Sequence, residues 1–581
     1  MMRIQVHVHA KLRTCHPCSL PTNHGTSLPC LYAKAISRHN PGMTPELIVH
    51  AGRIVGGRSS AVRMATSVAV LDGRIAAVGL RGQIGRLRGR NTEVLSLPHA
   101  ALMPAFIDAH THFFDWACRP DMIELADATS AAEVLRRIGR AAKARKPGEW
   151  VVARGFDKNH WAAGTTRLAE QPSFPSAGDL DAVTGAVPTQ VSSRDGHTMW
   201  VNTAALRLAG ITAATKAPAG GSIHRDAVGN PTGILQENAI GLLPAVESVL
   251  TDGQIERALL RGIRRAHRYG ITCVHSVDGV DGLRWFQRLR AAGTLSLRIR
   301  YAIPADRIDH AIALGLQGGL GDDLLRICGV KVFADGSLGS QSALMVEPYP
   351  ARPRYRGVAV CVGAGLRRLA CKAARAGLPC WIHAIGDRAN HEVLNALAEA
   401  RRLERQRLLH RIEHAQCVRP ADARRMGRLG IIASMQPCHI VGDIDTAERH
   451  WSNVLPWTYP IRALERAGVT LAFGSDIPVE TFDPIVGLHA AVNRQTLDLR
   501  PSDGWQMHQA IGVRNALRAY TAGAAAAAGD ADRLGGVAPG MFADLVVLSG
   551  DPTRIPRQRL LDLRVLATIC DGKVVHRSDH G

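Results

Sequence analysis

Eight short apolar segments, separated by helix-forming stretches, constrain the fold of this chain most strongly. The stretches between them are rich in Arg, Ala and Leu. Strands that alternate with helices indicate a parallel sheet, and eight such units indicate a closed (β/α)8 barrel of the TIM type. The sequence therefore predicts an α/β protein whose main domain is a barrel over residues 101–532. The eight segments are ALMPAFIDAH (101–110), GITCVHSVDG (270–279), LSLRIRYAI (295–303), ICGVKVFADG (327–336), LPCWIHAIGD (378–387), HRIEHAQ (410–416), GIIASMQP (430–437) and VTLAFGSDIP (469–478).

Both ends of the chain carry short β-prone segments with Asp-Gly turns at Asp72-Gly73 and Asp571-Gly572. Neither end could bury a sheet alone, so we expect residues 43–100 and 533–581 to form one composite β-sandwich. About 160 residues separate the first barrel segment from the second, several times the length of one strand–helix unit. We therefore predict a large insertion over about residues 120–255 that covers the mouth of the first strand.

The first 42 residues differ from the rest of the chain. They contain five basic residues, no acidic ones and no sustained period. We interpret them as an unpatterned extension before a natural start at Met43, and a basic targeting arm is the alternative. The N-terminus lacks the apolar core of a secretory signal, and no run approaches the roughly 18 apolar residues that a membrane span needs. A cytoplasmic protein without membrane contact is expected.

The formal net charge of +21 raises nucleic acid as a partner. The chain has nine Lys and 62 Arg, and the arginines are scattered along the sequence and form no single basic block. A nucleic-acid interface needs a basic stripe, so we expect none. The 12 Cys show no repeating spacing and are interpreted as reduced thiols. The expected partner is a small molecule. Whether the protein forms a homo-oligomer stays open.

Polar residues stand at the ends of several barrel segments, where barrels of this kind place catalytic groups. The first segment ends in His110 and His112, whose alternate positions put them on one face of a strand. The fifth and sixth segments carry His383 and His414, and the eighth carries Asp476. Imidazole and carboxylate are the ligands that zinc prefers. We therefore predict one or two Zn²⁺ ions, or another divalent metal, per chain.

Lys331 lies inside an apolar segment, where an unpaired ammonium is costly. It is the only Lys between Lys216 and Lys372 in a chain dominated by Arg, so the position selects an amine. An amine in a dry site has a lowered pKa and can add CO₂, giving a carbamate that could bridge two metal ions. The alternative is a lysine paired with Asp335 or Asp108.

Taken together, these motifs resemble the amidohydrolase superfamily, in particular its family 3 with the YtcJ-like proteins and the N-substituted formamide deformylases. The resemblance runs from about Met43 to the end of the chain. It implies a composite β-sandwich, a metal-dependent TIM barrel and hydrolysis of a non-peptide carbon–nitrogen bond, usually that of an amide. The motifs that carry it are PAFIDAHTHF, RDGHTMWVNTAAL, GNPTGILQE, KVFADGSLGSQSALM, WIHAIGDRANHEVLNA, HRIEHAQ, SMQP, FGSDIPV and GVAPGMFADLVVL.

The resemblance also implies two metal sites. The two histidines of the first strand and Asp476 would bind one ion. His383 and His414 would bind the second, with carbamylated Lys331 between them. A metal-bound water would attack the carbonyl carbon, and Asp476 would take its proton and pass it to the departing nitrogen as general base and acid.

Three further residues are candidates for substrate binding. His197 lies in the predicted insertion, and His439 follows the seventh segment. Both are interpreted as pocket-wall or oxyanion groups, with a structural hydrogen bond as the alternative for each. Arg388 could pair with a substrate carboxylate, although a local ion pair with Asp387 or Glu392 competes. The glycine-rich stretch GSLGSQ (336–341) predicts a close backbone approach.

Two rival functions remain open. A deaminase of the same superfamily typically has Glu three residues after the fifth-strand His, and Gly386 occupies that position here. A non-catalytic scaffold is the second rival, but all six ligand positions carry competent side chains. The sequence therefore predicts an amide hydrolase that acts on an N-substituted formamide or another N-acyl compound.

Overall fold

A computed structural model describes residues 44–56, 64–118, 122–146, 148–161, 174–244 and 251–578. The predicted extension over residues 1–42 lies outside the described residues, so its role stays a prediction. Among the described residues, no helix is long and apolar enough to cross a membrane.

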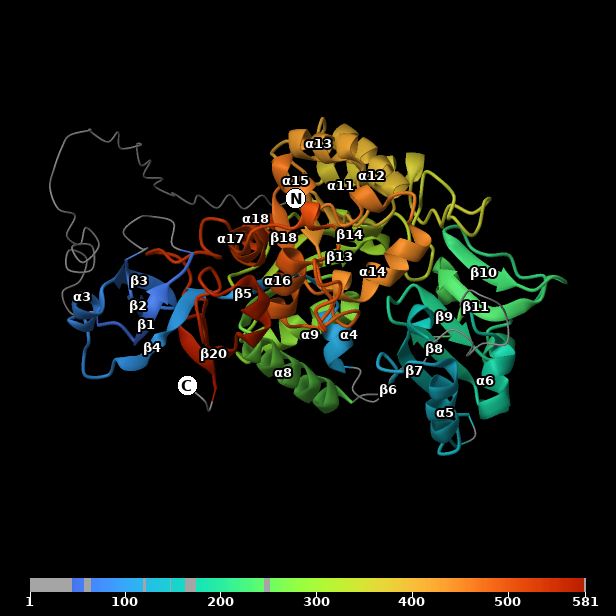
Figure 1. Cartoon of the computed structure of the whole chain (residues 1–581), viewed down its shortest axis with the longest axis horizontal. Helices are drawn as coiled ribbons and strands as arrows, with labels where there is room; N and C mark the ends of the chain where they lie inside the picture. Colours follow the sequence, from blue (N-terminus) through green and yellow to red (C-terminus); the bar gives the residue numbers. More distant parts are fainter. Residues whose placement is uncertain are drawn as a thin grey trace, which may run out of the picture. The chain divides into compact units, whose positions relative to one another are not determined.

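Eight parallel strands form the predicted barrel, and each strand pairs with the next one along the sequence (Figure 1). Beyond the last strand, Ile477 bridges Thr111 of the first strand in parallel, which brings the two edges together. The barrel sheet is therefore nearly closed. Its strands are β5 (Phe106–Thr111), β12 (Ile271–Ser276), β13 (Arg298–Pro304), β14 (Leu325–Phe333), β15 (Cys380–Ala384), β16 (Arg411–His414), β17 (Ile432–Met435) and β18 (Leu471–Phe473).

The barrel strands are buried on both faces, which explains why they read as continuous apolar runs. Helices pack around the strands and share one large apolar core with them. The helices that follow the insertion are α8 (Asp252–Arg268), α9 (Val280–Ala291), α10 (Ile308–Ala313), α11 (Gly363–Arg375), α12 (Asp387–Ala400), α13 (Pro420–Leu429), α14 (His439–His450), α15 (Ile461–Arg466), α16 (Pro484–Asn493), α17 (Val513–Arg518) and α18 (Ala524–Ala527).

A seven-stranded sheet joins the two ends of the chain, with N-terminal strands in blue beside C-terminal ones in red (Figure 1). The segment ALMPAFIDAH is divided, because ALMP ends β4 in this sheet and the barrel strand begins at Phe106. All seven strands form one sheet, and the sandwich arrangement stays a prediction. In spatial order they are β21 (Lys573–Arg577), β20 (Val565–Cys570), β19 (Leu545–Leu548), β4 (Glu93–Pro104), β1 (Leu47–Ile54), β2 (Ser67–Leu71) and β3 (Arg74–Gly79), with helix α3 (Arg81–Gly85) after β3.

The residues between β5 and β12 contain a six-stranded sheet of their own. Its helix α5 begins after Ser130, whose hydroxyl accepts the Glu133 N–H, and buries Val134, Ile138 and Ala142 at four-residue spacing. In spatial order the strands are β10 (Gly221–Arg225), β11 (Pro231–Glu237), β9 (Thr198–Val201), β8 (Thr189–Ser193), β7 (Val151–Phe156) and β6 (Ile123–Glu124). The helices are α4 (Phe113–Cys118), α5 (Ala131–Ala142), α6 (Ala177–Thr184) and α7 (Thr203–Leu208).

Candidate active site

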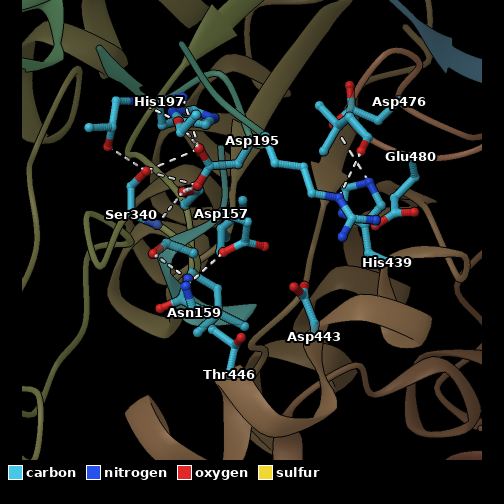
Figure 2. Close-up of a pocket in the computed structure, with 18 of the residues that line it drawn as sticks. Asp157, Asn159, Asp195, His197, Ser340, His439, Asp443, Thr446, Asp476 and Glu480 are labelled. Atoms are coloured by element: carbon cyan, nitrogen blue, oxygen red, sulfur yellow. Dashed lines mark hydrogen bonds and ion pairs between the residues drawn. The ribbon is translucent and has the colours of Figure 1, made fainter. Parts of the chain in front are cut away.

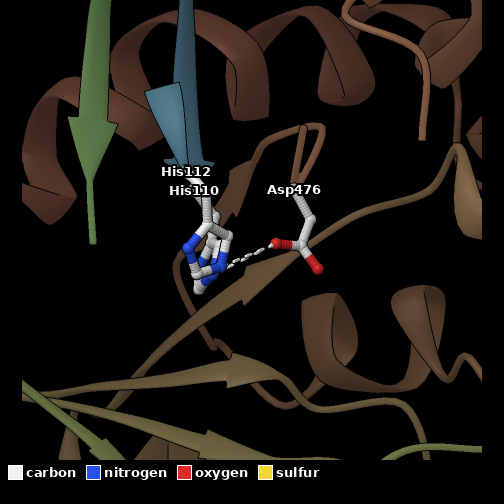
Figure 3. A group of neighbouring side chains, drawn as sticks. All are labelled: His110, His112 and Asp476. Atoms are coloured by element: carbon white, nitrogen blue, oxygen red, sulfur yellow. Dashed lines mark ion pairs between the residues drawn. The ribbon is translucent and has the colours of Figure 1, made fainter. Parts of the chain in front are cut away.

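Two histidines and one aspartate converge where β5 and β18 end (Figure 3). His110 lies on β5, His112 follows that strand directly, and Asp476 lies three residues beyond β18. The Nε2 atoms of both histidines lie 3.5 Å from Oδ1 of Asp476. That oxygen is buried and has no hydrogen-bond partner among the described residues, so it is available to a cation. Two imidazole nitrogens and a carboxylate oxygen fit a divalent ion such as zinc.

Gly474 allows the first and last barrel strands to approach closely. A Cβ atom at this position would lie 2.6 Å from the backbone nitrogen of His110 and 2.6 Å from Oδ1 of Asp108. The same Asp108 oxygen accepts the N–H groups of His110 at 3.1 Å and Ser475 at 2.9 Å. Any side chain at Gly474 would separate the histidine strand from Asp476.

Glu413 contacts His110 at Nδ1, the ring nitrogen that faces away from Asp476. Oε2 of Glu413 lies 2.6 Å from Nδ1 of His110, and both side chains are fully buried. The Arg411 guanidinium donates to both Glu413 oxygens at 2.7 and 2.9 Å. A carboxylate behind a histidine fixes its ring orientation and leaves the other nitrogen for a metal. Burial also lowers the pKa of His110 well below its usual value, so the ring stays neutral.

Glu413→Gln is expected to weaken metal binding by about 10–100-fold, because the charge behind His110 is lost. The measurement is the metal dissociation constant from titration of the metal-stripped protein. Glu404→Gln is the matched control, since Glu404 forms a comparable pair with His410 at 2.8 Å just before β16. Equal metal affinities of the two variants would rule out the role given to Glu413.

Lys331 lies on β14 and is only 3% exposed. Its Nζ atom is 3.3 Å from Nε2 of His110. Among the described residues no carboxylate forms an ion pair with it, and Asp335 instead accepts three backbone N–H groups. Burial lowers the pKa of Lys331 to about 8, although Glu413 opposes the shift. About a tenth of this amine is therefore neutral at pH 7, a far larger fraction than in an ordinary lysine.

His383 and His414 complete the set, with ring centres 4.5 Å apart. Nε2 of His383 lies 3.0 Å from the carbonyl oxygen of Gly336, and Nδ1 of His414 lies 2.8 Å from Oε1 of Gln436. Each ring therefore has one nitrogen held by the protein and the other left for a ligand. Burial lowers the pKa of both histidines well below the usual value, which favours neutral, metal-binding rings.

Two of the six predicted ligands have left-handed backbone conformations. The φ angle is 71° at His414 and 59° at Asp476. Such conformations cost on the order of 1–3 kcal/mol in residues other than glycine and cluster at functional sites. The strained backbone turns both side chains toward the same end of the barrel as His110.

His197 and His439 lie beside the predicted ligands. The His197 ring centre is 5.0 Å from that of His383, and its Nδ1 is 2.8 Å from Oε2 of Glu237. Nε2 of His439 is 3.8 Å from Oδ2 of Asp476 and has no hydrogen-bond partner among the described residues. Both histidines therefore lie next to the predicted ligands, and their role in binding substrate stays a prediction.

Arg388 lies apart from this group. It is exposed at the start of α12 and is not among the residues that line the pocket. The predicted local pair with Asp387 is also replaced, because Asp387 accepts from Arg419 at 2.8 Å. Arg388 is left out of the function proposed below.

A pocket that is open to solvent lies over this group (Figure 2). Its wall includes His197, His383, His414, His439 and Asp476. Residues before and after β8 also line it, so the segment between β5 and β12 contributes to the wall of this pocket.

Asp195 attaches the insertion to the barrel. Its carboxylate accepts the hydroxyls of Ser193 and Ser337 at 2.5 Å and that of Ser340 at 2.8 Å. A Cβ at Gly339 would lie 2.9 Å from Oδ2 of Asp195, so the glycine-rich stretch approaches this carboxylate closely. Sequence reasoning missed both Asp195 and Glu413. The available signals were the adjacency of Glu413 to His414 in HRIEH and the position of Asp195 in the motif RDGHTMWVNTAAL.

The chain was then compared with known proteins. A model of the amidohydrolase family matches residues 93–576. The protein LONG AFTER FAR-RED 3 of Arabidopsis thaliana is 32% identical over 552 residues, which are 92% of this chain and 92% of that protein. The Bacillus subtilis protein YtcJ is 29% identical over 518 residues, 88% of this chain and 96% of its own. The N-substituted formamide deformylase of Arthrobacter pascens is 29% identical over 551 residues, 90% of this chain and 97% of its own.

A solved structure supports the same relationship. An uncharacterized metal-dependent hydrolase from Pyrococcus horikoshii OT3 superposes with a TM-score of 0.68 at 26% identity, covering 88% of this chain and 99% of that one. The resemblance seen in the motifs is therefore confirmed. The chain belongs to the amidohydrolase family, and it is a metal-dependent hydrolase of that superfamily.

Proposed function

We propose that this protein hydrolyses the carbon–nitrogen bond of a small amide, such as an N-substituted formamide or another N-acyl compound. The observation that carries the proposal is the group formed by His110, His112 and Asp476, because Asp476 also lines the pocket. The name of the Arthrobacter pascens relative supports an amide as the substrate class.

The first ion would be held by His110, His112 and Asp476, and a second by His383 and His414 with a carbamate on Lys331. A bound divalent ion, zinc in our proposal, lowers the pKa of water and polarises a carbonyl oxygen. We take Nε2 of His439 as the group that orients the amide, because it faces Asp476 and has no hydrogen-bond partner among the described residues.

Asp476 would move the proton in this reaction. With Oδ1 on the first ion, Oδ2, which lies 3.8 Å from Nε2 of His439, would accept a proton from water and return it to the departing nitrogen. Protonation of that nitrogen matters because an amine is a poor leaving group without it. Glu237 would keep the His197 ring in place at the opposite wall through the contact at its Nδ1.

The surroundings of Gly386 favour amide hydrolysis over deamination. A deaminase of this superfamily would need Glu at this position. A Cβ at Gly386 would lie only 2.1 Å from the carbonyl oxygen of Leu344, and its N–H donates to Asp335. No larger side chain fits here without a backbone shift. A screen of N-formyl, N-acyl and cyclic amides against amino-substituted heterocycles, with metal-replete protein, separates the two activities.

Asp476→Asn is expected to lower kcat by about 10²–10⁴-fold, because the amide cannot act as general base. Amide hydrolysis is measured in excess metal, with the bound metal counted in the same samples. Asp483→Asn is the control, since Asp483 caps α16 by accepting the Ile485 N–H and Asn caps equally well. Wild-type kcat in a metal-loaded Asp476→Asn protein would exclude the proton-transfer role.

A further inference from the structure

A buried lysine in the pocket lacks a counter-ion. Lys158 begins a short 3₁₀ helix (Lys158–His160) after β7 and is only 3% exposed, yet it lines the pocket. Its ammonium donates to Oδ1 of Asn159 at 3.2 Å and lies 4.5 Å above the ring of Phe174. No carboxylate is ion-paired with it among the residues that the structure describes. An ammonium has three hydrogens to donate, and a buried one without partners is costly.

The charges around Lys158 leave this end of the pocket short of negative charge. Burial is the main cause that lowers the pKa of Lys158 to about 8, and Arg449 and Arg352 add to the shift. Asp157 and Asp195 oppose it, but neither contacts the ammonium. Asp195 already accepts three serine hydroxyls. Lys158 is therefore mostly cationic at neutral pH, and among the described residues Asn159 is the only hydrogen-bond acceptor that its ammonium contacts.

Lys158 stands away from the reacting groups. Figure 2 shows Asn159 and Thr446 at one end of the pocket, well separated from Asp476 and His439 at the other. Since Lys158 contacts Asn159, its ammonium lies at the end of the pocket away from Asp476 and His439.

We propose that Lys158 binds a carboxylate carried by the amide substrate, at a subsite formed with Asn159 and Phe174. The inference rests on the proposed function and names its substrate class. Lys158, Arg449 and Arg352 carry one more charge than the carboxylates Asp157 and Asp195, which matches a single negative charge. The double charge of a phosphate would exceed that surplus. The ring of Phe174 offers an apolar surface to the carbon chain that precedes the carboxylate.

Paired substrates test this subsite. N-formyl ω-amino acids of three spacer lengths are compared with N-alkylformamides of the same lengths, which lack the carboxylate. N-alkyl monoamides of dicarboxylic acids form a second series, with the carboxylate on the acyl side. We expect the wild-type protein to prefer at least one carboxylate series by about 10–100-fold in kcat/KM, mainly through KM. In Lys158→Met this ratio should fall to about one, and in Lys158→Arg it should partly recover.

Lys216→Met is the matched control, because Lys216 is exposed in the same insertion, and it should keep the wild-type ratio. Lys158→Gln is a second neutral variant in case the Met variant does not fold. Hydrolysis of neutral formamides without any preference for a carboxylate would overturn the subsite and leave the proposed function standing.

A binding measurement separates the two proposals when no amide is hydrolysed. Calorimetric titration compares each N-formyl amino acid with its neutral carboxamide, in wild-type and Lys158→Met proteins. Carboxylates also bind metals, so only the affinity that disappears in Lys158→Met counts in favour of the subsite. Equal carboxylate affinity in both proteins overturns it. Lys158-dependent binding without hydrolysis would retain the subsite and reject amide hydrolysis.

Discussion

Replacing His110 and His112 together with Ala is expected to remove both the metal and the hydrolytic activity. These two side chains supply both nitrogen donors of the group that they form with Asp476. Without them, one carboxylate oxygen remains, which is too few ligands for a stable zinc site. We expect kcat/KM to fall by at least ~10³-fold, which is about 4 kcal/mol of transition-state stabilisation.

Metal content by elemental analysis and amide hydrolysis are measured on the same preparations. A double variant of two exposed histidines, His99→Ala with His310→Ala, controls for histidine loss as such and should keep both properties. Full metal occupancy in the His110/His112 variant would contradict the assignment of these two histidines as metal ligands. Loss of metal with unchanged hydrolysis would instead reject the metal-dependent mechanism.

Substitution of Lys331 is the second change for which we expect a large loss of metal and activity. We propose that its neutral amine adds CO₂ to form a carbamate and releases one proton, and that this anion bridges two ions. Lys331→Ala should lose metal and activity, and short carboxylic acids should restore part of both. Lys331→Arg should be inactive although the positive charge is kept, because a guanidinium does not form the carbamate. The proximity of Nζ to Nε2 of His110, at 3.3 Å, supports this position for a shared ligand.

The carbamate is detected directly by ¹³C NMR of protein equilibrated with labelled CO₂. Lys372→Ala is the control, since Lys372 is an exposed lysine that pairs with Asp309 and should leave the signal unchanged. An active Lys331→Arg protein, or a spectrum without a carbamate signal, would contradict the bridge. The four histidines and Asp476 would then serve a single ion.

The sequence by itself determined the elements of this protein and the direction of many side chains. The apolar segments became the eight barrel strands because a strand covered on both faces needs an unbroken apolar run. The two-residue period placed His110 and His112 on one face. The order of polar residues at the strand ends then indicated a common site, because parallel strands of a barrel end at the same side.

Only the tertiary structure decided which distant groups meet. Glu413 contacts His110, which is 303 residues away in the sequence. The alternation of residues along β16 does not predict this partner. The left-handed backbone at His414 and Asp476 likewise has no sequence signal. Lys158 reaches the pocket because the insertion packs on the barrel, where Asp195 accepts the hydroxyls of Ser337 and Ser340. Local periodicity determines whether a segment is a helix or a strand and which of its side chains share a face. These contacts depend instead on barrel closure and on packing between segments far apart in the chain.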